Sequence, residues 1–190
     1  MYDYLVNTLK LSAQVIGIEF RPELVKFCNE VAKKTDFHHL SFRSGTIQNT
    51  STKNTNILIA LHACDTATDD AIYQGITATS EIIVCSPCCH KQIRKQMHVP
   101  DNLKPLLKNG ILEERQAEIV TDAIRALIME SHGYETKVFE YISSEHTGKN
   151  LMITGVKTDK KIDTEKILAQ IAELKELFGI KEHYLESLFK

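Results

Sequence analysis

The sequence predicts an α/β fold built on an open, mostly parallel sheet. Short apolar runs alternate with segments of helical spacing, so that the runs at residues 15–19 and 57–61 are each followed by a polar stretch and a helix. The run at residues 57–61 is continuously apolar, which is typical of strands that a parallel sheet buries on both faces. Two later runs, at residues 134–142 and 150–156, are too close for a crossover helix and indicate an antiparallel hairpin.

The elements of the first half follow from local signals. Apolar residues at helical spacing predict a short opening helix that reaches about residue 10, before the strand at residues 15–19. Pro22 begins a helix that runs to about Lys34. A strand at residues 40–44 and a polar loop over residues 45–55 then lead to the strand at residues 57–61.

The second half continues the alternation and ends in helices. Residues 66–79 predict a helix whose first turn holds Thr66 and Asp69 in capping-box-like spacing, and residues 82–84 the next buried strand. An interrupted helical region covers residues 91–109, and a longer helix runs from Glu113 to His132, closed by Gly133. We expect a domain over residues 1–158 and a C-terminal helical appendage over residues 159–190.

The composition is that of an ordinary globular chain. A formal net charge of −2 gives no global attraction to nucleic acid or anionic membrane. The five cysteines are an odd number with two adjacent, so they are expected as reduced thiols rather than a disulfide framework. Residues 1–11 lack the apolar core of a signal peptide or membrane span, so we expect a cytoplasmic protein with no membrane partner.

Two polar, thiol-bearing segments each follow an apolar run. The first covers residues 61–65 (Leu-His-Ala-Cys-Asp) and the second residues 86–90 (Ser-Pro-Cys-Cys-His). In an open parallel sheet, the ligand crevice lies outside the carboxyl ends of the strands. We therefore expect both segments to face one cleft that holds the functional site.

Three motifs carry a resemblance to a known family. They are His62-Ala63-Cys64-Asp65-Thr66-Ala67-Thr68-Asp69, Pro87-Cys88-Cys89-His90-Lys91 and Glu145-His146-Thr147-Gly148-Lys149-Asn150. With the order of elements, they resemble the class I S-adenosylmethionine-dependent methyltransferases, and within these a methyltransferase-like domain family similar to the tRNA acceptor-stem 2′-O-methyltransferases. The resemblance spans residues 15–157. It implies a Rossmann-like methyltransferase sheet, S-adenosylmethionine as cofactor, and RNA as the favoured acceptor.

One part of that family's pattern is missing from the sequence. No Gly-x-Gly pattern lies upstream of Glu19, whereas in the family a first strand and its glycine-rich loop cradle the methionine part of the cofactor. In a strand order of 3-2-1-4-5 the first strand is central, so the strands at residues 15–19 and 56–61 each lack a neighbour. We expect these strands to close onto each other, or an upstream segment or a second copy of the chain to fill the gap.

The resemblance places cofactor contacts at the ends of three strands. Glu19 would bind both ribose hydroxyls through charge-assisted hydrogen bonds, with Phe20 beside it. Backbone contacts to the adenine base fall to Gly45, Thr46 and Ile47. Leu61 and His62 would lie beside the methyl sulfonium. The alternatives are a solvated strand-end carboxylate for Glu19 and an ordinary turn at residues 45–47.

Three residues are candidates for accepting a proton from the methyl acceptor. His62, Asp65 and His90 lie in the two strand-end segments, and burial can bring such groups near the working pH. For Asp65 the alternative is a helix start, because Asp before Thr66 suits the N-terminus of a helix.

The adjacent cysteines allow several interpretations. We favour Cys88 and Cys89 as part of a tight loop that shapes the acceptor pocket. Cys88, Cys89 and His90 also allow a zinc site, since Cys85-x-x-Cys88 has the spacing of a ligand pair and His62 and Cys64 are expected nearby. Against this, Cys85 lies within an apolar strand, where a lone cysteine is usually a small hydrophobe. We therefore expect no metal; a zinc-binding protein and a redox or nucleophilic thiol remain the alternatives.

Basic residues near the second segment are candidates for substrate contacts. Lys91, followed by Arg94 and Lys95, could meet the phosphates of a nucleic acid, although such a run is usually a solvated face. His146 and Lys149, in the loop of the predicted hairpin, belong to the same question. The family resemblance therefore implies a methyltransferase. The alternative from another class of protein is a binding or scaffold domain that has lost the cofactor loop.

Overall fold

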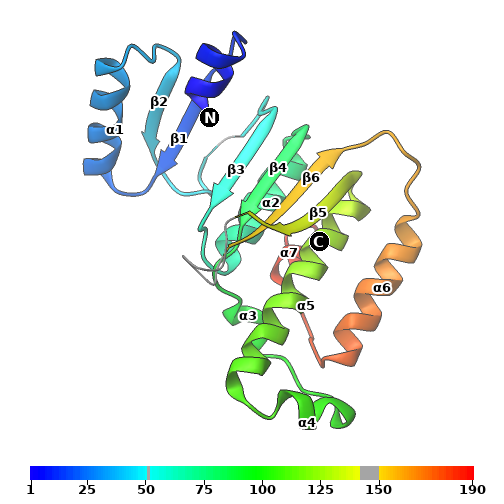
Figure 1. The fold of residues 1–190 in the computed structure, drawn as a ribbon. Coiled ribbons are helices and arrows are strands. Elements are labelled where there is room, and N and C mark those ends of the chain that lie inside the picture. Colours follow the sequence, from blue (N-terminus) through cyan, green and yellow to red (C-terminus); the bar gives the residue numbers. More distant parts are fainter. Residues whose placement is uncertain (51, 142–149) are drawn as a thin grey trace. The chain divides into compact units, whose positions relative to one another are not determined.

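The computed structural model describes residues 1–50, 52–141 and 150–190. The chain divides into two compact units, residues 1–51 and residues 52–190, which are drawn in Figure 1. The division falls at residue 51, inside the stretch expected as one domain, while the expected boundary at residue 158 lies within the second unit. Among the described residues, no helix combines the length and apolar character that crossing a membrane requires.

The first unit is a small strand–helix–strand arrangement. It contains the π-helix η1 (Tyr4–Thr8), β1 (Val15–Glu19), α1 (Pro22–Lys34) and β2 (Leu40–Ser44). The two strands are parallel and pair in register from Val15↔Leu40 to Glu19↔Ser44. The Asn29 side chain joins α1 to β2, because its amide donates to the Phe42 carbonyl at 2.9 Å and its oxygen accepts from the Phe42 N–H at 2.8 Å.

The second unit contains a four-stranded sheet with the order β3-β4-β6-β5. Its strands are β3 (Ile57–Leu61), β4 (Ile82–Ser86), β5 (Tyr134–Glu140) and β6 (Leu151–Lys157). β3 and β4 are parallel, whereas β6 runs antiparallel to both β4 and β5. The predicted antiparallel hairpin is confirmed.

Helices of this unit pack on the sheet and on one another (Figure 1). They are α2 (Thr66–Thr77), α3 (Lys91–Arg94), the 3₁₀ helix η2 (Asp101–Leu103), α4 (Lys104–Leu107), α5 (Gly110–Ser131), α6 (Thr164–Leu177) and α7 (Tyr184–Ser187). α5 packs against β5 and β6, α6 packs along α5, and α7 packs on α2. The core between α5 and the sheet includes the fully buried Ile124, Met129 and Ile153.

The strand order agrees with the predicted fold class. β2-β1 and β3-β4 are the pairs that a 3-2-1-4-5 sheet has on either side of its central strand, with an antiparallel hairpin added after β4. Within the described residues, β1 pairs only with β2, and β3 pairs only with β4. Closure of these two strands onto each other, and filling of the gap by another segment or copy, both stay predictions.

The helix α2 begins at Thr66, as predicted, but the capping pattern predicted for its first turn does not form. Asp65 occupies the N-cap position, which was the alternative for this residue, and its side chain makes no capping hydrogen bond to the helix. Asp69 does not reach back to complete a capping box, because its carboxylate binds the buried Arg125. The ion pair between Asp69 of α2 and Arg125 of α5, which are far apart in the sequence, takes the place of the local capping contact.

Candidate functional site

The two thiol-bearing segments leave the sheet side by side. β3 and β4 are parallel neighbours, and the last residues of the strands, Leu61 and Ser86, are register partners. The His62 N–H donates to the Ser86 carbonyl at 3.0 Å, which continues the pairing one residue beyond β3. Further on, the Sγ atoms of Cys64 and Cys88 lie 3.0 Å apart. The two segments meet at one edge of the sheet, as the sequence predicts.

The first segment turns sharply through unusual backbone conformations. His62 has φ of 57° and Asp65 has φ of 54°, so two residues without glycine's freedom adopt the left-handed region on either side of Cys64. Such conformations cost free energy and persist only where the surrounding structure holds them. The loop is therefore held in a specific shape.

Asp65 is one of the groups that hold this shape. Its Oδ1 accepts a hydrogen bond from the Gln92 N–H at 3.0 Å, in the first turn of α3. Its carbonyl accepts from Nη2 of Arg125 at 2.9 Å and from the Thr68 N–H at 3.2 Å. Asp65 thus occupies the first position before α2, but its carboxylate joins the first segment to the second. That carboxylate already has a donor in the structure, whereas its role as a proton acceptor stays a prediction.

Behind the two segments lies a buried network of charges. Nε and Nη2 of Arg125 donate to the Oδ1 and Oδ2 atoms of Asp69 at 2.8 and 3.0 Å. Nη1 of Arg125 donates to Oδ1 of Asp122 at 3.0 Å, and both oxygens of Asp122 lie 3.0 Å from Nε2 of His90. The side chains of these four residues are 7% exposed or less. A chain of polar contacts therefore links α2, α5 and the second segment.

The electrostatics of the network follow from burial and proximity. Burial by itself would lower the pKa of Arg125, but the charges of Asp69 and Asp122 outweigh it and raise that pKa above its ordinary value. Burial raises the pKa of the Asp69 carboxyl, and Arg125 opposes this rise. Because the fork between Arg125 and Asp69 is bidentate, we treat the pair as charged at neutral pH.

Sequence reasoning missed three members of this network, Asp69, Asp122 and Arg125. The available signal was a pair of opposite charges three residues apart, Asp122 and Arg125, within a stretch that is otherwise mostly apolar, residues 117–129. From the helical periodicity alone, such charged residues are predicted to lie on the solvent-exposed face of a helix, whereas Asp122 and Arg125 are buried residues of α5.

His90 lies where this network meets two cavities. One cavity, of about 90 Å³, is lined by Cys89, His90 and Lys91 together with residues of α5. The other, of about 190 Å³, is lined by Cys88, His90 and Asp122 together with residues of α5, β5 and β6. Nδ1 of His90 is buried and has no hydrogen-bond partner among the described residues. A ring nitrogen without a partner, held by a carboxylate at its other nitrogen, has the arrangement of a proton acceptor.

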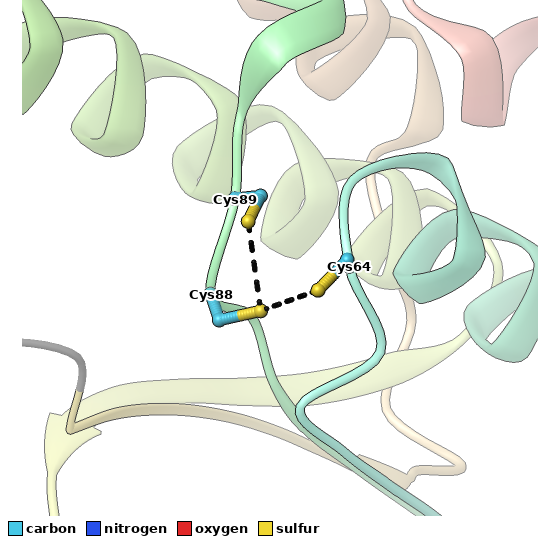
Figure 2. A group of neighbouring side chains, drawn as sticks. All are labelled: Cys64, Cys88 and Cys89. Atoms are coloured by element: carbon cyan, nitrogen blue, oxygen red, sulfur yellow. Dashed lines mark hydrogen bonds between the residues drawn. The ribbon is translucent and has the colours of Figure 1, made fainter.

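The four cysteines of the second unit divide into a cluster and a core residue. Figure 2 shows Cys64, Cys88 and Cys89 with their thiols turned toward one another; the Cys88–Cys89 Sγ distance is 3.7 Å. Cys85 is buried in β4, and burial raises its pKa to about 12, as expected for a small hydrophobe. Burial and the thiol hydrogen bonds of its two neighbours also raise the pKa of Cys88 to about 12, which disfavours a nucleophilic thiolate at neutral pH.

The charged residues of this face are mixed in sign. Lys91 is exposed at the start of α3, and Arg94 lies 3.3 Å from Glu114 in a partly exposed ion pair. Arg115 pairs with Glu118 at 2.8 Å on α5. Of the other predicted substrate contacts, His146 and Lys149 lie outside the described residues.

The predicted cofactor contacts at β1 and β2 belong to the first unit. The Gly45 N–H donates to the Glu19 carbonyl at 3.2 Å, so the ends of both strands are together there. Hydrogen bonds from the Arg21 side chain and backbone lower the pKa of Glu19 and keep its carboxylate charged. Phe20 is 72% exposed. A turn over residues 46–50 follows, in which the Thr50 hydroxyl donates to the Thr46 carbonyl at 2.8 Å.

The remaining predicted cofactor contacts, Leu61 and His62, are exposed at the end of β3 and belong to the second unit. The structure thus brings together Glu19 with Gly45, and His62 with the cysteines and Ser86, each set within its own unit.

Comparison with known proteins identifies the family. Residues 1–96 match a family described as a methyltransferase domain, which is just over half of the 190-residue chain. The chain belongs to this methyltransferase domain family. The matched region contains both thiol-bearing segments and ends shortly after α3. The α/β architecture is accordingly a Rossmann-like methyltransferase fold.

Other comparisons add little to this methyltransferase domain. No curated protein matches it. Two solved structures are similar at 10% identity: the YcgJ protein from Bacillus subtilis, with a TM-score of 0.40 over 77% of this chain and 83% of that one, and the PH0226 protein from Pyrococcus horikoshii OT3, with a TM-score of 0.41 over 84% and 76%.

Proposed function

We propose that this chain transfers a methyl group from S-adenosylmethionine to an acceptor, with RNA as the favoured acceptor class. The observation that carries the proposal is the family match over residues 1–96, because that region includes both strand-end segments where the polar groups gather. The tRNA methyltransferase resemblance of the motifs supports RNA.

The residues of the first unit have the chemistry that an adenosyl group requires. Glu19 is a charged carboxylate at the carboxyl end of β1, and two oxygens suit two ribose hydroxyls. The backbone at Gly45 lies directly beside it. When bound, S-adenosylmethionine supplies a methyl group activated by a positive sulfur. In this proposal Glu19 orients the ribose and Gly45–Ile47 border the base.

The second unit supplies the proton acceptor. Asp122 holds Nε2 of His90 at 3.0 Å, which favours the tautomer with its proton on Nε2 and a lone pair on Nδ1. Nδ1 takes the proton from the acceptor hydroxyl or amine as the new bond to carbon forms and the bond from carbon to sulfur breaks. Alignment and proton removal then supply most of the rate enhancement.

Calorimetric titration with S-adenosylmethionine and S-adenosylhomocysteine tests whether the chain binds the proposed cofactor. We expect micromolar affinity for the natural chain and a loss of roughly 10- to 100-fold for Glu19→Ala, because charged hydrogen bonds to the ribose are removed. Glu23→Ala, on the first turn of α1, is the matched control and should bind normally. Absence of binding in the natural chain would favour the non-catalytic scaffold alternative.

Transfer of a radiolabelled methyl group to total RNA tests the proposed reaction and the role of His90 as proton acceptor. His90→Ala and Asp122→Asn should slow transfer by about 10²- to 10⁴-fold while cofactor affinity stays constant. Arg115→Ala, which lines the same cavity, should change the rate much less. Labelling of protein or small molecules instead of RNA would contradict the proposed acceptor class.

A further inference from the structure

Three thiols from two separate loops converge at the carboxyl ends of β3 and β4. Their Sγ atoms all lie within 4.8 Å of one another, with Cys88 3.0 Å from Cys64 and 3.7 Å from Cys89. In Figure 2 dashed lines join the sulfur of Cys88 to those of Cys64 and Cys89, and Cys64 comes from the loop that precedes α2. The sequence offers Cys85, Cys88 and Cys89 as ligands, with Cys64 expected nearby, and the structure gathers Cys64, Cys88 and Cys89 without Cys85.

The spacing of the sulfurs suits a shared ion. Zn–S bonds are about 2.3 Å, so two sulfurs on one tetrahedral zinc lie roughly 3.8 Å apart. The 3.7 Å separation of Cys88 and Cys89 is close to that value, and a small adjustment of Cys64 would open the 3.0 Å separation. Thiolates select soft ions such as Zn²⁺ over Mg²⁺ or Ca²⁺.

The surroundings hold the loops in place yet leave access to the ion. The left-handed backbone of His62 and Asp65 turns Cys64 toward the second loop, and the hydrogen bond from the Gln92 N–H to Asp65 joins the loops. Cys64 is exposed, whereas Cys88 and Cys89 are half-buried. One side of the cluster is thus open for entry of an ion and for a water as fourth ligand.

We propose that Cys64, Cys88 and Cys89 bind one thiophilic metal ion, with Zn²⁺ as its physiological form. Each thiol releases its proton to solvent as its sulfur takes a coordination position, so up to three protons leave for each ion bound. The ion ties together the two loops that carry His62, Asp65 and His90. The site is independent of whether the chain binds S-adenosylmethionine.

Metal titration of the chelator-treated, reduced protein tests the site. We expect one equivalent of Zn²⁺ to bind, and Co²⁺ to give the charge-transfer absorption of cobalt–thiolate bonds. At an ion concentration 100 times Kd, the Tm should rise by about 5–10 °C. Cys64→Ser and Cys89→Ser should each weaken binding by roughly 100-fold or more, whereas Cys28→Ser, in the first unit, should bind as the natural chain does.

Alkylation of the natural chain gives a second readout that needs no variant. Bound Zn²⁺ should protect Cys64, Cys88 and Cys89 from iodoacetamide, as read by peptide mass spectrometry, and leave Cys28 reactive. The proposal is overturned if the folded protein gives no cobalt–thiolate absorption, or if the double variant Cys64→Ser/Cys89→Ser retains the affinity of the natural chain. Equal alkylation with and without Zn²⁺ would overturn it as well.

Discussion

The two compact units differ in how much core each one contains. In residues 1–50, only Tyr2 and Ala32 are buried apolar residues, and the sheet there has two strands. Every other buried apolar residue that the structure describes lies in the second unit, which has a four-stranded sheet. Because stability scales with the apolar surface that is buried, we expect the second unit to be the more stable of the two.

This difference coincides with a division of roles. The first unit carries Glu19 and Gly45, for which we propose cofactor contacts, whereas the second carries His90 and the buried network behind it. The proposed proton acceptor thus lies in the densely packed unit, and the cofactor contacts proposed at the ends of β1 and β2 lie in the lightly packed one. Regions of low local stability are the ones that open most readily, and ligand-binding segments are often drawn from them.

The largest effect is expected from Arg125→Met, which tests the second unit. The variant leaves Asp69 and Asp122 buried without their cation, so it should lower the free energy of unfolding by about 3–5 kcal/mol. Urea unfolding measures the loss, and hydrogen exchange by mass spectrometry locates it. Arg115→Met, on the exposed face of the same helix, is the control and should have little effect. A loss no larger than that of the control would show that the network contributes little.

A pH effect of intermediate size is expected at His183, which is fully buried before α7. Burial, reinforced by the positive charge of Arg125, lowers its pKa from 6.5 to about 3. Below pH 6.5 the unfolded chain therefore binds a proton that the folded chain does not. Stability is fully present above pH 6.5 and falls as the pH drops toward 3, by about 2 kcal/mol between pH 6.5 and 5.

His183→Asn isolates this contribution. Nδ1 of His183 accepts from the Leu185 N–H at 3.3 Å, and an asparagine oxygen can take that place without titrating. Urea unfolding at several pH values should show a flatter dependence for the variant over this range. The rise in the pKa of Asp69 acts in the opposite direction in both proteins and cancels in the comparison. Parallel curves for the two proteins would exclude His183 as the source.

The smallest effect is expected from Gly17→Ala, which tests the first unit. Gly17 is the register partner of Phe42, and an added Cβ would lie 2.4 Å from Cδ1 of that ring. The ring would have to move, at a cost of about 1–2 kcal/mol. Hydrogen exchange should accelerate roughly tenfold or more in β1 and β2 and stay constant in β4 and β6. Gly110→Ala, where nothing lies within 4 Å of the added carbon, should be neutral or stabilising.

If either Arg125→Met or Gly17→Ala accelerates exchange equally in both units, the chain unfolds as one cooperative unit and the contrast drawn above is wrong. Acceleration confined to the unit that carries the substitution would support it.

Sequence patterns predicted the strands closely. The strands at residues 15–19, 40–44 and 57–61 and the helix Pro22–Lys34 coincide with the observed elements, because apolar runs and a proline at a helix start are local signals. The boundaries within the interrupted helical region at residues 91–109 were not predicted. In the structure this region forms the short helices α3, η2 and α4, with Pro100 and Pro105 near the breaks. The helix α5 begins three residues before the predicted start.

The sequence alone determined the fold class, the order of elements and the meeting of two polar strand ends, since each depends on local periodicity and on general rules for parallel sheets. Only the tertiary structure decided which groups meet. Three contacts illustrate this: Asp69 with Arg125, His90 with Asp122, and Cys64 with Cys88. The two residues of each pair are 56, 32 and 24 positions apart in the sequence, respectively. Such contacts depend on how helices pack on the sheet, and no local pattern encodes that packing.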